Sequence, residues 1–145
     1  MEHLHLLYDL WLPDGEILKY VEPLRAILVE AAVRGRATIY HQYWHQFEPW
    51  GVTGFLLLKE SHISVHTWPE EDNFAAVDIF PCGPMDVDLI VHLLGEALQP
   101  VRERLTRQVR GAVPVNSSSR HPILGRETGR QRDGTTRSGT EVLAP

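Results

Sequence analysis

The chain has 145 residues, close to the size of one ordinary domain, with 14 basic and 19 acidic side chains. Five of the basic and three of the acidic residues follow residue 113, so residues 1–113 have a net charge of about −7, which argues against a nucleic-acid partner and suits a cationic small-molecule substrate. The single cysteine, Cys82, leaves no intrachain disulfide and fits a reducing cytoplasm, and no apolar run reaches the roughly 18 residues of a membrane span.

The first part of the chain predicts a strand, a helix and a second strand. Residues 4–11 have the pattern of a strand, and the Leu-Pro-Asp-Gly sequence that follows predicts a turn. Apolar residues then recur at spacings of three and four, as on one face of an amphipathic helix that ends near Gly35; they are Ile17, Val21, Leu24, Leu28 and Ala31. Over residues 37–47 the period changes to two, which predicts a long strand.

The rest of the chain predicts four strands and a helix. Strands are expected at 52–59, 62–68, 74–80 and 104–113, and an amphipathic helix at 86–98. Because the connections between the central strands are short, neighbouring strands should be antiparallel, with both helices on one face. We therefore expect residues 1–113 to form an α+β fold, a two-layer α/β sandwich with a mainly antiparallel sheet. Residues 114–145, rich in Ser, Gly, Thr and Arg, are expected to form a disordered polar tail.

The segment from Glu60 to Glu70, ESHISVHTWPE, holds more reactive side chains than a strand needs for packing. It contains two serines, two histidines and two acids beside a Trp-Pro break. A strand with a purely structural role alternates apolar and solvated residues and seldom concentrates such groups. The segment therefore indicates a site of chemistry.

This segment closely resembles the self-cleavage segment of the prokaryotic S-adenosylmethionine decarboxylases, a pyruvoyl-dependent family in which a serine preceded by glutamate becomes the cofactor. Four further features agree in order and approximate spacing: HLLYDLW with His5 and Asp9, HQFEPWGVTG, FAAVDIFPCG and a helical pattern beyond. The resemblance covers roughly residues 3–110.

The resemblance implies that the bond between Glu60 and Ser61 breaks by self-cleavage and that Ser61 becomes a covalent pyruvoyl group. The substrate amine would form a Schiff base with that ketone, which withdraws electrons as carbon dioxide leaves. Pyridoxal phosphate, the other common electron sink, needs a lysine; the chain has only Lys19 and Lys59, with no phosphate-binding glycine loop. The implied reaction converts S-adenosylmethionine to decarboxylated S-adenosylmethionine, the aminopropyl donor for spermidine synthesis, in a homodimer of processed αβ protomers.

The resemblance also implies roles for single residues. His66 corresponds to the histidine that helps proton removal during processing, Thr53 to a hydroxyl that aids the acyl shift, and Cys82 to the cysteine that protonates the decarboxylated intermediate. Glu70 and Phe47 correspond to substrate-binding positions, facing the ribose hydroxyls and the adenine. Because Ser61 and His66 are five positions apart, a flat strand would point them to opposite faces. The assignment therefore requires a bend or twist near Ser61.

The sequence departs from the family at two places. After Trp-Pro-Glu the family usually has Tyr, Gly and another aromatic, whereas this chain has Glu71, Asp72, Asn73 and Phe74. Added carboxylates there would suit a guanidinium or ammonium tail, and some relatives decarboxylate L-arginine or L-ornithine, which leaves these as alternative substrates. Gln46 stands where relatives commonly have a basic residue.

Three other classes of function compete with this one. Histidines four apart, such as His62 and His66, can chelate a metal on a helix, but on a strand they lie about 13 Å apart, too far for one ion unless strands pair suitably. A serine hydrolase would need the Gly-x-Ser-x-Gly turn, which Ser61 lacks. A pseudoenzyme or interaction protein would keep the fold without cleaving, although Ser61, His66 and Cys82 are all retained.

Overall fold

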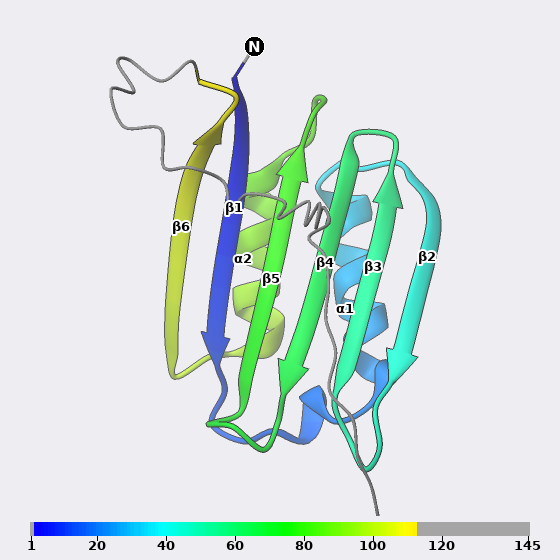
Figure 1. Ribbon diagram of the computed structural model, residues 1–145, viewed down its shortest axis with the longest axis vertical. Coiled ribbons are helices and arrows are strands. Elements are labelled where there is room, and N and C mark those ends of the chain that lie inside the picture. The colour runs from blue at the N-terminus through cyan, green and yellow to red at the C-terminus, as the bar shows by residue number, and fades with distance from the viewer. Residues whose placement is uncertain (1, 113–145) are drawn as a thin grey trace, which may run out of the picture. The chain divides into compact units, whose positions relative to one another are not determined.

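A six-stranded antiparallel sheet with two helices on one of its faces makes up the described part of the computed structural model, residues 2–112 (Figure 1). The strand order is β2-β3-β4-β5-β1-β6. The elements are β1 (His3–Trp11), a short 3-10 turn η1 (Glu16–Leu18), α1 (Val21–Arg34), β2 (Ile39–Gln46), β3 (Val52–Leu58), β4 (Ser61–Trp68), β5 (Phe74–Pro81), α2 (Val87–Leu98) and β6 (Arg102–Arg110). The predicted two-layer α+β sandwich is confirmed. The predicted tail, residues 114–145, lies outside the described residues.

The core lies between the sheet and the helices because alternate residues of the central strands point toward α1 and α2. Every second residue of β3, and of β5 as far as Ile79, is buried, and the next is partly or fully exposed, as expected for strands with one covered face. The largest fully buried side chains are aliphatic and come from both layers; among them are Leu6, Leu10, Leu28, Leu56, Ile79, Ile90 and Leu94.

Helix α1 starts later than the apolar spacing predicts. Ile17 belongs to the 3-10 turn η1, and the regular part of α1 follows Glu22, which has extended backbone angles (φ −95°, ψ 134°). Pro23 explains this, because the residue before a proline is driven out of the helical region, while proline itself is tolerated in the first turn. Helix α2 begins as predicted, with the Asp86 carboxylate accepting a hydrogen bond from the Leu89 N–H at 3.0 Å.

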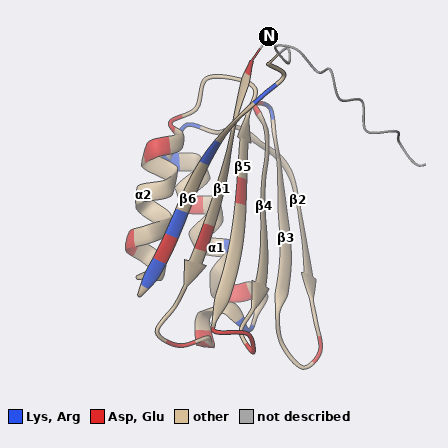
Figure 2. Ribbon diagram, turned by 60° about the vertical axis from the view of Figure 1, so that its left-hand side comes forward, with Lys and Arg blue, Asp and Glu red and all other residues tan. Residues whose placement is uncertain are grey.

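Strand β6 closes one edge of the sheet and carries four arginines and one glutamate, so its charge is mainly positive (Figure 2). On one of its faces Arg104 forms an ion pair with Asp9 of β1, and on the other Arg107 forms one with Asp88 of α2. Such residues are typical of edge strands that must not pair with another sheet. No helix within residues 2–112 combines the length and apolar composition that crossing a bilayer requires.

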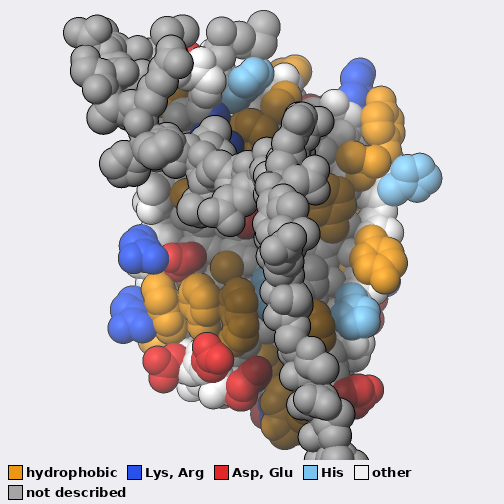
Figure 3. All heavy atoms as spheres, viewed as in Figure 1, with side chains coloured by type: hydrophobic (Ala, Val, Ile, Leu, Met, Phe, Trp, Pro, Cys, Tyr) orange, Lys and Arg blue, Asp and Glu red, His pale blue; other side chains and the backbone are white. Residues whose placement is uncertain are grey.

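The sheet face away from the helices, here called the open face, carries an unusual mixture of aromatic, aliphatic and histidine side chains. Figure 3 looks onto it and shows hydrophobic and histidine side chains among charged ones. Large apolar residues of this face remain about 40% exposed, among them Phe55 (39%) and Leu57 (41%). Several exposed apolar side chains on one face of a sheet favour a region that binds a partner or ligand.

Candidate active site

Strand β4, in the middle of the sheet, positions the residues of the ESHISVHTWPE segment. It pairs with β3, where Thr53 faces His66 and Leu58 faces Ser61, and with β5, where Pro81 faces Ser61. The side chains of Ile63, Val65 and Thr67 are buried against the helices. The alternation therefore leaves His62, Ser64, His66 and Trp68 on the open face.

One group of predicted residues gathers at the carboxyl-terminal end of β4. The Thr53 hydroxyl and His66 Nδ1 share a hydrogen bond across the β3–β4 pair. The His66 ring lies between two aromatic rings, with centroids 4.1 Å from Trp68 and 5.7 Å from Phe47. Burial lowers the pKa of the His66 imidazole from its ordinary value of 6.5, and the Glu70 carboxylate opposes that shift. Neutral His66 can therefore accept a proton near pH 7.

A pocket of about 480 Å³ opens beside this group. Its lining combines aromatic side chains with two carboxylates, which suits a ligand that has a flat ring and a positive charge. Both predicted substrate-binding residues line it, together with His66; the full lining is Phe47, Glu48, Pro49, Trp50, Gly51, His66, Thr67, Trp68 and Glu70.

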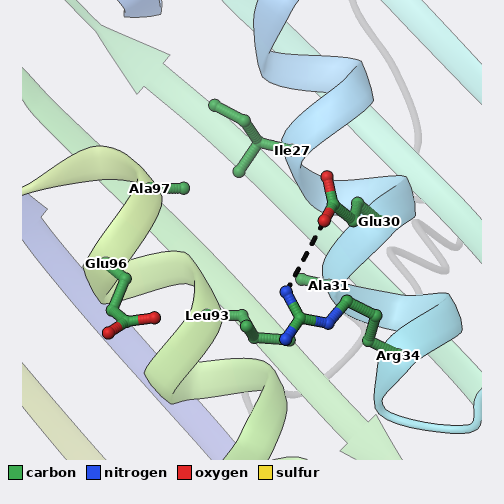
Figure 4. Close-up of a pocket in the computed structure, with 7 residues that line it drawn as sticks. All are labelled: Ile27, Glu30, Ala31, Arg34, Leu93, Glu96 and Ala97. Carbon is green, nitrogen blue, oxygen red and sulfur yellow. Dashed lines mark ion pairs between the residues drawn. The ribbon is translucent and has the colours of Figure 1, made fainter.

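A different pocket, of about 220 Å³, lies between the two helices on the far side of the sheet (Figure 4). The Glu30–Arg34 ion pair, at 3.6 Å, joins two residues of α1 in the wall of this pocket. None of the residues predicted from the sequence to act in catalysis or binding lines it. The pocket on the β4 side is therefore the one that belongs to the site.

The second group of predicted residues lies at the amino-terminal end of β4. Ser61 has a φ of +130°, a region that residues other than glycine seldom adopt and that costs on the order of 1–3 kcal/mol. Its hydroxyl lies 3.2 Å from Nδ1 of His62, a residue of the open face. The sequence assignment requires a bend or twist near Ser61, and the positive φ of Ser61 is a backbone distortion at that position.

Glu60, on the other side of the predicted scissile bond, is held firmly. Its carbonyl oxygen accepts a hydrogen bond of 2.6 Å from the Cys82 N–H, and its side chain is buried. The Cys82 side chain is an exposed free thiol. The structure therefore places the backbone of Cys82 beside Glu60 and Ser61.

The two groups are far apart within one chain. Ser61 and His66 are five residues apart on β4, a distance of about 16 Å along a strand. The Thr53–His66 pair, which the sequence assigned to processing at Ser61, is therefore not brought to Ser61 of the same chain. A single described chain contains two half-sites at opposite ends of β4.

Gln46 is a site residue whose function the sequence did not reveal. Its Nε2 donates to the carbonyls of Lys19 (2.8 Å) and Gly51 (3.1 Å), and its Oε1 accepts from the Val21 N–H (3.1 Å). These bonds fasten the pocket loop, residues 47–51, to the start of α1. The amide suits this position because its nitrogen donates while its oxygen accepts. A lysine or arginine side chain only donates, so it would leave the Val21 N–H without this acceptor.

Within residues 2–112 the structure has no cluster of three or more side chains able to hold a metal ion. His62 and His66 lie on one strand, and each has aromatic neighbours. The observed surroundings of both histidines are thus those of aromatic packing and hydrogen bonding.

Comparisons with known proteins bear on both fold and site. A sequence model of the S-adenosylmethionine decarboxylase family matches residues 4–111. The chain is 40% identical over 114 residues to an S-adenosylmethionine decarboxylase proenzyme of Sulfurihydrogenibium sp. (strain YO3AOP1), covering 78% of this chain and 85% of that one. It is 36% identical over 119 residues to a proenzyme of the same name from Persephonella marina, covering 81% and 89%.

A solved structure agrees with these relatives. The crystal structure of the adenosylmethionine decarboxylase from Aquifex aeolicus VF5 superposes with a TM-score of 0.70 at 36% identity, covering 81% of this chain and 97% of that one. Fold, motifs and relatives together define the class of the protein as a decarboxylase. In particular, the chain belongs to the S-adenosylmethionine decarboxylase family.

Proposed function

We propose that the chain is a self-processing, pyruvoyl-dependent enzyme that converts S-adenosyl-L-methionine to decarboxylated S-adenosylmethionine, the aminopropyl donor for spermidine synthesis. The observation that carries the proposal is the constrained Glu60–Ser61 bond. A serine at φ +130° follows a carbonyl that accepts a 2.6 Å hydrogen bond from the Cys82 N–H. Backbone strain and a donor aimed at a carbonyl oxygen both favour attack on that carbonyl.

Self-cleavage follows from these groups in three steps. The Ser61 hydroxyl oxygen attacks the Glu60 carbonyl carbon, the C–N bond breaks, and the freed amine takes the proton, which leaves an ester. A base then removes the Ser61 α-proton; the Cβ–O bond breaks, and Glu60 leaves as a carboxylate. Water finally replaces the amino nitrogen of the resulting dehydroalanine, and ammonia departs. The Cys82 N–H stabilises the negative charge that develops on the Glu60 oxygen in the first step.

The surroundings of Ser61 fit a pyruvoyl group. Ser61 is only partly buried, and its side chain approaches His62 on the open face, so a carbonyl formed there would be accessible to a substrate amine from that face. When present, the group supplies an electron sink for the carbon that loses carbon dioxide. The Cys82 thiol, next to Glu60, is proposed to return a proton to that carbon.

The aromatic pocket is the proposed site of the nucleoside end of the substrate. Phe47 offers a flat ring for the adenine, and the Glu70 carboxylate offers two acceptors for the ribose hydroxyls. Trp50 and Trp68 also line the pocket, and ring faces attract a positive charge such as the sulfonium of this substrate.

We propose that the working enzyme is a homodimer of processed αβ protomers with their open faces packed together. Two features support this. The open face is rich in exposed apolar side chains, which a second copy would cover. The half-sites lie at opposite ends of β4, and a two-fold axis near the middle of that strand would bring Ser61 of one protomer to the Thr53–His66 pair of the other.

We further propose a cytoplasmic location and a processed domain spanning residues 1–113. Cys82 is the only cysteine of the sequence, and its thiol is free and exposed, as suits a reducing compartment. The proposed partner is a small-molecule substrate, with no role for nucleic acid or a membrane.

The release of carbon dioxide tests the proposed reaction. Purified protein is given carboxyl-labelled S-adenosylmethionine, L-arginine or L-ornithine in parallel, with a Ser61→Ala protein as the blank. The proposal expects release from S-adenosylmethionine that depends on Ser61. Preferential release from either free amino acid would overturn the proposed substrate.

A further inference from the structure

The Glu60 side chain has specific hydrogen-bond partners. A residue that only precedes a cleavage site does not require them. Only 8% of Glu60 is exposed, and a charged group withdrawn from water is costly without partners. One oxygen accepts a 2.9 Å hydrogen bond from the Thr38 N–H, and the other accepts a 3.1 Å bond from the Thr38 hydroxyl. One residue thus satisfies both oxygens.

Thr38 is itself fixed in place. It lies in the connection between α1 and β2, and its carbonyl accepts a 2.9 Å hydrogen bond from the Lys59 N–H. Three hydrogen bonds therefore join Thr38 to residues 59 and 60. We call this set, the three bonds between Thr38 and Lys59–Glu60, the Thr38 clamp.

Glu60 is confined from the opposite side as well. The Cys82 N–H binds its carbonyl oxygen, and a Cβ added to Gly83 would come within 3.2 Å of the Glu60 Cγ. The residue before the strained Ser61 therefore has little freedom to rotate. Strain at Ser61 persists only if its neighbours cannot relax, because a loose Glu60 would let the backbone return to ordinary angles.

We propose that Thr38 is a positioning residue for self-cleavage, which holds the Glu60 carbonyl carbon in reach of the Ser61 hydroxyl. This inference rests on the proposed self-cleavage between Glu60 and Ser61. Thr38 touches neither the reacting atoms nor the aromatic pocket, and it acts through the Glu60 side chain. After cleavage the same bonds would tie the new carboxyl terminus at Glu60 to Thr38 of its own fragment, residues 1–60.

The test follows self-cleavage over time in freshly synthesised full-length protein, with intact-mass detection. Thr38→Ser keeps the hydroxyl, Thr38→Val replaces it with a methyl group, and Glu60→Gln removes the charge at constant size. Tyr8→Phe is the matched control, because it also removes one hydroxyl that binds a carboxylate, that of Glu103 at the far edge of the sheet. Melting temperature and the rate of decarboxylation per cleaved chain are measured in parallel.

The proposal expects Thr38→Val and Glu60→Gln to cleave about tenfold more slowly or worse, since Thr38→Val removes the hydroxyl hydrogen bond and Glu60→Gln replaces charge-assisted hydrogen bonds by weaker neutral ones. Thr38→Ser and Tyr8→Phe should cleave at nearly the wild-type rate, and turnover per cleaved chain should not change. Wild-type cleavage rates for Thr38→Val and Glu60→Gln would overturn the inference alone, as would equal slowing by Tyr8→Phe. A wild-type chain that stays whole would overturn the proposed function itself, and the inference with it.

Discussion

His66 and Thr53 share a hydrogen bond across the β3–β4 pair, at the opposite end of β4 from Ser61. His66, the base proposed for self-cleavage, therefore lies about 16 Å along the strand from Ser61 of the same chain. In a dimer packed through the open faces, each active site would take its serine from one protomer and its histidine from the other. This arrangement can be tested by complementation.

Two inactive variants should restore each other if the site is shared. His66→Ala alone should cleave at least about a hundredfold more slowly, because it lacks the general base, and Ser61→Ala should not cleave at all. When the two are co-expressed, the Ser61→Ala protomer supplies His66 to the intact serine of the His66→Ala protomer. Intact-mass analysis should then detect cleaved His66→Ala chains. Unchanged slow cleavage in the mixture would contradict the shared site.

The rate of self-cleavage should depend on pH through His66. Burial lowers the pKa of its imidazole below 6.5, so the base is neutral and active at pH 7 and is lost as the pH falls through its folded pKa. We expect a flat rate from about pH 7 to 8 and a decline on the acid side. A rate that keeps rising above pH 7, measured by quenched time courses, would mean that a group of higher pKa limits cleavage.

Gln46→Glu should weaken substrate binding while leaving self-cleavage intact. The substitution removes the donors that hold the pocket loop to Lys19 and Gly51, so the loop that carries Phe47 loses its fixed position. We expect KM to rise about tenfold, with a smaller change in kcat. Gln108→Glu, on the exposed strand β6, is the control because it changes the charge by the same amount. Equal KM values for the two variants would remove Gln46 from pocket formation.

Thr67→Val should destabilise the fold by about 1–3 kcal/mol, the usual cost of unsatisfied buried polar groups. The buried Thr67 hydroxyl accepts from the Val52 N–H at 2.8 Å and donates to the Leu18 carbonyl at 2.9 Å. The same substitution at the exposed Thr106 serves as the control. Urea unfolding compares the two; similar free energies of unfolding would show that the Thr67 hydroxyl contributes no stability.

The strands could be predicted because one face of the sheet is buried. Alternation along residues 52–58 and 74–81 follows from that burial, and Asp86 signals the start of α2 through a cap that any helix needs. The start of α1 was misjudged because the apolar period continues through Ile17, whereas Pro23 prevents Glu22 from being helical. Local patterns thus predicted elements better than boundaries.

The site was predicted less fully, for a physical reason. The residues of the ESHISVHTWPE segment could be identified by their chemistry, and Phe47 and Glu70 indeed line one pocket. Which of the site residues lie at which end of β4 depends on the strand length and the register. The hydrogen bonds from Thr38 to Glu60 and from Gln46 to Lys19 join segments more than 20 residues apart, and no periodicity in a sequence encodes such bonds.

The central claim is that this chain cleaves itself between Glu60 and Ser61. Denaturing intact-mass spectrometry of the purified wild-type protein tests it most directly. The account predicts two fragments, residues 1–60 with an ordinary carboxyl terminus and residues 61–145 with a pyruvoyl group at the amino terminus. A single mass for the whole chain, or fragments that meet at any other bond, would contradict it.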